Sequence, residues 1–125
     1  MEKISISEKR GIIYNEGIHQ REIILYASPK SKIKRDDFAL GLTIIKSNKV
    51  HEFHKHDKNQ EIVIVYDGKG MATIGDDSFE IERGDLISID YDEKHSFTNN
   101  ENEDLKLLWV YSPAGLADEK VLIKD

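Results

Sequence analysis

Hydrophobic residues occur in short runs along the whole chain, and polar or turn-forming residues separate one run from the next. Most runs are rich in Ile, Val and Leu and about four to eight residues long, which is typical of β-strands. No window has the spacing of a helix of about ten or more residues, although 118–122 could form a short turn. The pattern predicts an all-β sandwich or barrel, with strands at 23–26, 39–46, 49–54, 61–66, 70–74, 78–82, 86–90, 95–98 and 105–111.

Two of the expected strands, 61–66 and 105–111, are hydrophobic on both faces. Successive side chains of a strand point to opposite faces, and a strand that is hydrophobic on both faces is covered on both. A small barrel with surplus outward hydrophobic surface usually buries it against a partner. We therefore expect a homodimer. The alternative is that the N-terminal segment 1–22 covers this surface within one chain.

The length of 125 residues predicts one domain spanning the chain. A net charge of -6 and a pI of about 5.4 disfavour a nucleic-acid partner, because no basic field attracts phosphates. The basic cluster 30–35 is followed at once by Asp36 and Asp37. We interpret it as a solvated turn, with a phosphate or partner contact as the alternative.

The chain contains no cysteine, so it has neither disulfides nor thiolate ligands. Its N-terminus lacks the hydrophobic region of a signal peptide. No run approaches the roughly 20 residues that a membrane-spanning helix needs. We expect a cytoplasmic protein that binds neither nucleic acid nor membranes.

The strongest chemical signal lies between His54 and Glu61, where a His-x-His pair precedes a carboxylate. Residues two apart in a strand share a face, so His54 and His56 are expected to point the same way. Neutral imidazole and carboxylate together are a ligand set for transition metals. His95, in a later predicted strand, is a fourth candidate. The four residues predict a metal site.

These spacings resemble two motifs of the cupin superfamily. The first motif, G-x5-H-x-H-x3,4-E-x6-G, fits 48–68, with Asn48 at the leading glycine position. The second, G-x5-P-x-G-x2-H-x3-N, fits 84–99, with Asp90 and Asp92 at the proline and second glycine positions. All three substitutes are turn formers, so we expect the turns to survive, with altered geometry in the second motif. Both motifs in order, on a strand-rich chain of this length, make the resemblance specific.

The resemblance implies a single cupin domain, a jelly-roll barrel or double-stranded β-helix, with a metal bound inside it. The ligand positions of the family correspond to His54, His56, Glu61 and His95, each with its usual residue type. One divalent transition metal per chain follows, and iron, manganese, nickel and zinc all remain open. The N-terminal segment 1–22 is then expected to pack on the barrel or on a partner.

Several neighbouring residues compete for a place in the site. Gln60 is adjacent to Glu61, but the six-residue spacing to Gly68 and the preference of divalent cations for carboxylate favour Glu61. His51 has the opposite strand parity to His54 and is expected at the surface or rim. The remaining expectations are a rim position for His19, a turn role for Asn99, a place near the metal for Phe97 and a core position for Trp109.

Catalytic residues other than the metal ligands cannot be identified from the sequence. Tyr111 and Tyr26 are weak candidates for acid-base or orienting roles. Arg21 and Arg83 are candidates for a clamp on a substrate carboxylate, but neither can be placed; Arg83 is expected in a turn.

These expectations favour a metalloenzyme that acts on a small oxygen-rich substrate, such as a sugar or carboxylate, as a dioxygenase, an isomerase or epimerase, or a lyase. The alternative is a non-catalytic, metal-bearing module that binds or senses a small molecule. We favour the enzyme because no effector domain accompanies the barrel in this sequence. A metal-free structural barrel is disfavoured because all four ligand positions are filled.

Overall fold

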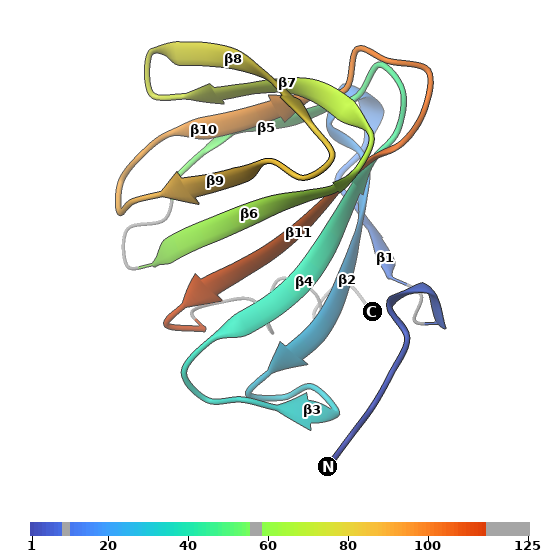
Figure 1. Ribbon diagram of the computed structural model, residues 1–125, viewed down its shortest axis with the longest axis vertical. Coiled ribbons are helices and arrows are strands. Elements are labelled where there is room, and N and C mark those ends of the chain that lie inside the picture. Colours follow the sequence, from blue (N-terminus) through green and yellow to red (C-terminus); the bar gives the residue numbers. More distant parts are fainter. Residues whose placement is uncertain (9–10, 56–58, 115–125) are drawn as a thin grey trace.

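The computed structural model describes residues 1–8, 11–55 and 59–114, and these residues form an almost entirely β structure (Figure 1). Two short 3-10 helices, η1 and η2, lie near the N-terminus. No helix in the described residues is long and hydrophobic enough to cross a membrane. The elements in chain order are η1 Ile6–Glu8, β1 Ile12–Tyr14, η2 Gly17–His19, β2 Arg21–Ser28, β3 Ile33–Lys34, β4 Ala39–Ile45, β5 Val50–His54, β6 Gln60–Asp67, β7 Lys69–Ile74, β8 Asp77–Glu82, β9 Leu86–Ile89, β10 His95–Thr98 and β11 Leu105–Ser112.

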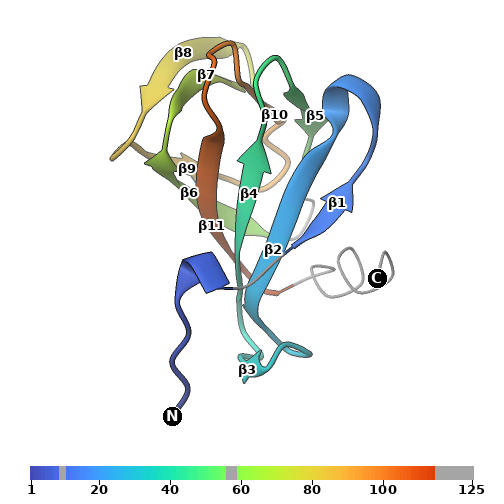
Figure 2. The ribbon, with the colours of Figure 1, turned by 90° about the vertical axis from the view of Figure 1, so that its right-hand side faces the viewer.

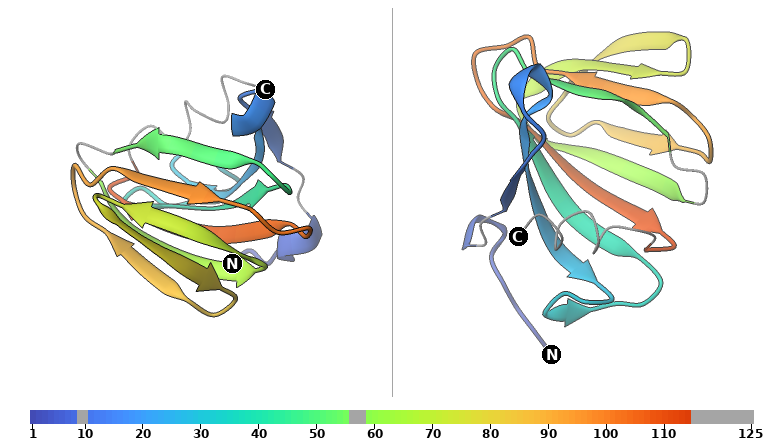
Figure 3. Two further views of the ribbon diagram at one scale, coloured as in Figure 1. Left: turned by 90° about the horizontal axis from the view of Figure 1, so that it is seen from above. Right: turned by 180° about the vertical axis from the view of Figure 1, so that it is seen from behind.

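The strands form two sheets that face each other, as the side view in Figure 2 shows. The larger, seven-stranded sheet has the order β1-β2-β4-β11-β6-β9, with β3 parallel to β2. The smaller, four-stranded sheet has the order β5-β10-β7-β8. Every other strand pair in the described residues is antiparallel. The view from above in Figure 3 shows the smaller sheet lying over the larger one, the jelly-roll arrangement that the resemblance implied.

All nine strands expected from the sequence are present, which confirms the all-β fold. Strands β1 and β3 were not expected, because they span only three and two residues and show no periodicity. A tight hairpin at Gly75 joins β7 to β8: Ile74 pairs with Asp77, and Gly75 has a left-handed φ of 59°. The turn expected at 118–122 lies outside the described residues.

The hydrophobic core lies between the two sheets. Ile45, Val65 and Leu105 are fully buried there, and Val63 is 1% exposed. Trp109 is also buried in this core, as expected, where its indole Nε1 donates to Thr43 Oγ1 at 2.9 Å. Burial of such side chains at roughly 25 cal/mol per Å² is the dominant stabilising term in folding.

The outer face of the larger sheet is also hydrophobic, and the N-terminal segment covers part of it. Ile4 and Ile6 pack against Ile24, Tyr26 and Leu42, and the Tyr26 hydroxyl donates to the Ile6 carbonyl at 3.0 Å. Figure 3, seen from behind, shows this segment outside the barrel. The rest of the face remains open, with exposed fractions of 37%, 44% and 62% for Ile64, Tyr66 and Leu86.

Two of the three motif positions that depart from the family pattern have a backbone conformation that glycine adopts readily. Asn48 and Asp92 have left-handed φ angles of 63° and 59°, a region that Asn and Asp visit more readily than most residues. Asn99 is fully buried, where its Nδ2 donates to the carbonyls of Ile45 and Glu103, at 2.8 and 2.7 Å. Its turn role is therefore confirmed.

Candidate metal centre

Three of the four predicted metal ligands come together inside the barrel. His95 begins β10 and pairs with His54 of β5, so both belong to the smaller sheet. Glu61 lies on β6 of the larger sheet. The ring centroids of His54 and His95 are 4.2 Å apart, and His95 Nε2 is 3.5 Å from Glu61 Oε1. These three side chains, His54, Glu61 and His95, are called the cluster below, and the cluster spans the two sheets.

The fourth predicted ligand, His56, lies outside the described residues. Within residues 1–8, 11–55 and 59–114, no group of three or more His, Asp or Glu side chains has the arrangement that holds a metal ion. The described part of the chain therefore supplies a cluster of predicted ligands without completing a coordination sphere.

The hydrogen bonds of His54 and His95 fit metal ligation. His95 Nδ1 is 2.9 Å from the Glu93 carbonyl oxygen, and His54 Nδ1 is 3.3 Å from that of Glu52. A carbonyl only accepts hydrogen bonds, so each Nδ1 carries the proton and each Nε2 keeps its lone pair. Backbone carbonyls commonly hold metal-binding histidines in this tautomer. The donor set therefore suits a divalent cation.

The choice between Gln60 and Glu61 agrees with their positions in the barrel. Glu61 is 9% exposed and shares the inward face of β6 with Val63. Gln60 is exposed, and its Nε2 donates to Asp90 Oδ1 at 3.2 Å. Only the Glu61 carboxylate is therefore directed toward the interior.

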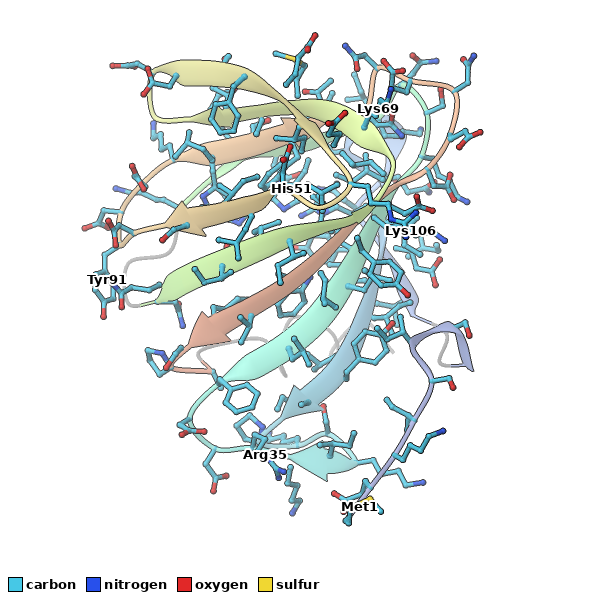
Figure 4. The ribbon with its side chains drawn as sticks, viewed as in Figure 1. Met1, Arg35, His51, Lys69, Tyr91 and Lys106 are labelled. Atoms are coloured by element: carbon cyan, nitrogen blue, oxygen red, sulfur yellow. The ribbon has the colours of Figure 1, made fainter. Side chains whose placement is uncertain are left out.

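His51 was expected at the surface or rim, and this expectation is wrong. It is 8% exposed, and its ring centroid lies 4.4 Å from that of His54. Figure 4 shows it between the two sheets. The reason is a β-bulge, because His54 pairs with His95 whereas His51 pairs with Phe97. From His54 to His51 is a step of three positions along β5, whereas the paired step on β10, from His95 to Phe97, is two positions. The extra residue in β5 turns the His51 side chain to the face opposite to the one that simple alternation predicts.

Three aromatic side chains are buried in the interior, and one of them is close to the histidines. Phe97 is 3% exposed, and its ring centroid lies 6.2 Å from that of His95, so it is close to a predicted metal ligand. Trp109 and Tyr111 stack with centroids 4.9 Å apart and an interplanar angle of 9°. Tyr111 also pairs with Glu61 between β11 and β6, so it remains a candidate.

Tyr26 lies away from the cluster, on the outer face of the larger sheet. Burial raises its pKa to about 12, and the nearby Tyr66 and Glu22 act in the same direction. A phenol with this pKa and this position has no access to a ligand inside the barrel. Tyr26 is therefore not an acid-base candidate for the site.

Arg21 has a role that could not be assigned from the sequence. It is 2% exposed at the start of β2, where it stacks 4.8 Å from the centroid of the Tyr14 ring. Its guanidinium donates to Glu52 at 2.7 and 3.3 Å and to the His19 carbonyl at 3.0 Å. Burial alone would raise the pKa of the Glu52 carboxyl, but the hydrogen bonds and charge of Arg21 outweigh it and lower the pKa.

His19 is at the rim, as expected. Its side chain is 41% exposed, and its Nδ1 is 2.8 Å from the Val50 carbonyl oxygen. It is therefore a useful reference histidine for tests of the cluster.

Comparison with known sequences places this barrel in a family. Residues 41–111 match the family model of the cupin domain. An uncharacterised protein of Methanocaldococcus jannaschii is 34% identical over 70 residues, which cover 55% of this chain and 56% of that protein. The HTH-type transcriptional activator RhaR of Shigella dysenteriae is 35% identical over 74 residues, or 54% of this chain and 26% of the activator. The chain thus spans about half of the first relative and a quarter of the second.

Solved structures share the fold of this barrel. A protein of Acidithiobacillus ferrooxidans, named for an inferred sugar phosphate isomerase activity, is 25% identical with a TM-score of 0.73, covering 86% of this chain and 70% of that one. A protein of Thermotoga maritima, named for an inferred oxalate decarboxylase activity, is 21% identical with a TM-score of 0.79, covering 90% and 99%. With the family model matching more than half of its length and these folds superposing on it, the chain belongs to the cupin family.

Proposed function

We propose that this chain is a metal-dependent cupin that binds a small oxygen-rich molecule, such as a sugar or carboxylate, and acts on it as an enzyme. One observation carries the proposal: His95 is 1% exposed, and its Nε2 lies 3.5 Å from the buried Glu61 carboxylate. Removing imidazole and carboxylate from water is costly. A divalent cation offsets this cost because both groups are its ligands.

The ion would be held by His54, Glu61 and His95 together with His56, one ion per chain. When bound, it supplies a Lewis acid that polarises a carbonyl or hydroxyl group of the ligand. The Glu52 and Glu93 carbonyls keep the imidazoles oriented. The buried aromatic rings of Phe97, Trp109 and Tyr111 exclude water from the interior around the cluster.

Isomerisation or epimerisation of a sugar is the first reaction class to test. The Acidithiobacillus protein, named for sugar phosphate isomerisation, combines 25% identity with a similar fold. The Thermotoga protein, named for oxalate decarboxylation, shares the fold at 21% identity, so it supports only the architecture. Lyase and dioxygenase reactions would be assayed after isomerisation and epimerisation.

A non-catalytic sensing role is the second candidate. The 35% identity over 74 residues of a transcriptional activator favours it specifically. In that case the same metal-bearing barrel binds its ligand and releases it without chemical conversion.

The first experiment is elemental analysis of protein purified without chelators or nickel resin. The variants are the double substitution His54→Ala/His56→Ala and the control His19→Ala. We expect about one equivalent of metal in the wild type and in His19→Ala, and almost none in the double variant. Absence of metal from the wild type, even after loading with iron, manganese, nickel and zinc, would overturn the proposal.

Turnover separates the two candidates. Metal-loaded protein is incubated with sugar phosphates and small carboxylates, with and without oxygen, and the ligands are followed by NMR. Conversion that disappears in His54→Ala supports an enzyme. Saturable binding without conversion of any bound ligand supports the sensing role.

A further inference from the structure

A partly buried ion pair links the two sheets, with the Arg21 side chain 1% exposed and that of Glu52 32% exposed. Arg21, on β2 of the larger sheet, binds the Glu52 carboxylate, on β5 of the smaller sheet, through two nitrogens at 2.7 and 3.3 Å. The Arg21 side chain is 1% exposed, and the stacked ring of Tyr14 and the His19 carbonyl fix its orientation. Arginine holds carboxylates in this two-point geometry with little freedom of rotation.

Glu52 lies within the bulge of β5, where strand pairing does not set its orientation. His51 and His54 pair with Phe97 and His95, and the two residues between them oppose Ser96 alone. A bulged residue lacks its ladder partner, so other contacts must fix its peptide group. Ser96 Oγ donates to the His51 carbonyl at 2.8 Å, and Arg21 anchors the Glu52 side chain.

The Glu52 carbonyl oxygen is close to two imidazoles at once. It lies 3.0 Å from His51 Nδ1 and 3.3 Å from His54 Nδ1. A carbonyl has two lone pairs and accepts from both rings. One peptide group therefore selects the same tautomer for both histidines, with the proton on Nδ1 and the lone pair on Nε2.

We propose that Arg21 is a positioning residue for the metal centre: through Glu52 it holds the bulge that places His51 beside His54 and presents one carbonyl to both rings. This inference rests on the proposed metal-dependent function, and it adds His51 to the residues that form the site. A buried ion pair contributes little net stability compared with hydrophobic residues of similar size. Orientation of the two histidines is the effect that distinguishes this pair from a structural contact.

The test replaces the ion pair without leaving a buried charge. The double variant Arg21→Met/Glu52→Leu retains volume and the backbone carbonyl but removes the link, and Arg21→Lys keeps a charge without the two-point contact. The matched control is Lys46→Met/Asp104→Leu, which removes an ion pair of 2.8 Å that does not contact the histidines. Each protein is measured for cobalt(II) affinity and visible absorption. The metal-free form is examined by long-range proton–nitrogen NMR of the imidazoles at about pH 8, where free histidine is neutral.

In the wild type we expect His51 and His54 to carry the proton on Nδ1. The double variant should lose this uniform tautomer and bind cobalt about tenfold more weakly, since partners of ligating histidines have effects of this size. Arg21→Lys should lie between, and the Lys46 control should match the wild type. Tautomers and cobalt affinity unchanged in the double variant, or changed equally in the control, would overturn the inference. Should the wild type bind no metal, the proposed function fails, and the NMR of the metal-free proteins still decides whether Arg21 positions the rings.

Discussion

Two strand pairs, one from each sheet of the barrel, differ in regularity and in chemistry. In the larger sheet, β4 and β11 pair in unbroken register from Ala39 with Tyr111 to Ile45 with Leu105. In the smaller sheet, the pairing of β5 with β10 shifts between His95 and Phe97. The regular strands contribute much of the hydrophobic core, whereas the irregular pair carries the described histidines of the cluster.

This difference shows how a barrel can separate stability from binding. A regular ladder maximises burial and tolerates little change in side-chain volume. A bulge weakens the ladder locally but re-aims a side chain, and here it directs His51 inward. Substitutions in the regular β4–β11 pair should therefore affect folding, and substitutions around the bulge of β5 should affect metal binding.

The largest stability effect is expected in the core of the larger sheet. Leu105→Ala removes a fully buried side chain and should lower the unfolding free energy of the metal-free protein by about 3 kcal/mol, from lost burial and the remaining cavity. Urea denaturation measures this loss. The control Ile18→Ala, at a position of η2 that is 54% exposed, should change it by less than about 0.5 kcal/mol. Similar losses in both variants would contradict the role of the β4–β11 pair in stability.

The predicted metal ligands should show the opposite behaviour. His56→Ala and His54→Ala should remove most metal affinity and lower the thermal midpoint only in metal-loaded protein, because a ligand that binds the folded state stabilises it. At a metal concentration of about 100 times Kd, the stabilisation that is lost amounts to about 2.7 kcal/mol. Calorimetry with and without chelator measures it, with His19→Ala as the control. An equal loss in the metal-free form would indicate a packing role instead.

The open outer face of the larger sheet should mediate the expected homodimer. Leu86→Glu places a charge on this face, and it should weaken dimerisation by about tenfold or more, because burying an unpaired carboxylate is costly. Sedimentation velocity measures the effect. Phe79→Glu, at a position of the smaller sheet that is 39% exposed, should leave the dimer intact. A wild type that is monomeric at all accessible concentrations would rule out this use of the face.

The smallest effect is expected from Tyr26 at alkaline pH. Its pKa in the folded protein is raised to about 12 from its ordinary value of 10.0. The associated stability is therefore fully present below about pH 10 and is lost as the pH rises toward 12. The unfolding free energy of Tyr26→Phe should fall less steeply over this range than that of the wild type. The control Tyr91→Phe, at an exposed position, should keep the wild-type slope, and equal slopes in all three proteins would refute the assignment.

Much of the fold could be predicted because strand formation leaves a local pattern. Each strand from β4 to β11 carries its own hydrophobic residues between turns, and Asn48 and Asp92 adopt the left-handed turn geometry expected of them. Strands β1 and β3 were missed because two or three residues are too few to show a period. The homodimer and the role of His56 remain predictions.

The candidate site was only partly predictable, and the reason is physical. Face assignment by parity assumes an unbroken strand, which held for Glu61 and Phe97 but failed for His51 across the bulge. The ion pair of Arg21 with Glu52 joins residues 31 positions apart. No local pattern indicates such a pair, because it depends on how two sheets meet.

The sequence by itself determined the strand content, the turns and the positions of the predicted ligands, since alternation, turn residues and motif spacing are properties of neighbouring residues. Only the tertiary structure decided that His51 belongs inside and that Arg21 lies behind the site. These placements depend on strand register and on contact between the two sheets, where a one-residue shift reverses the direction of a side chain.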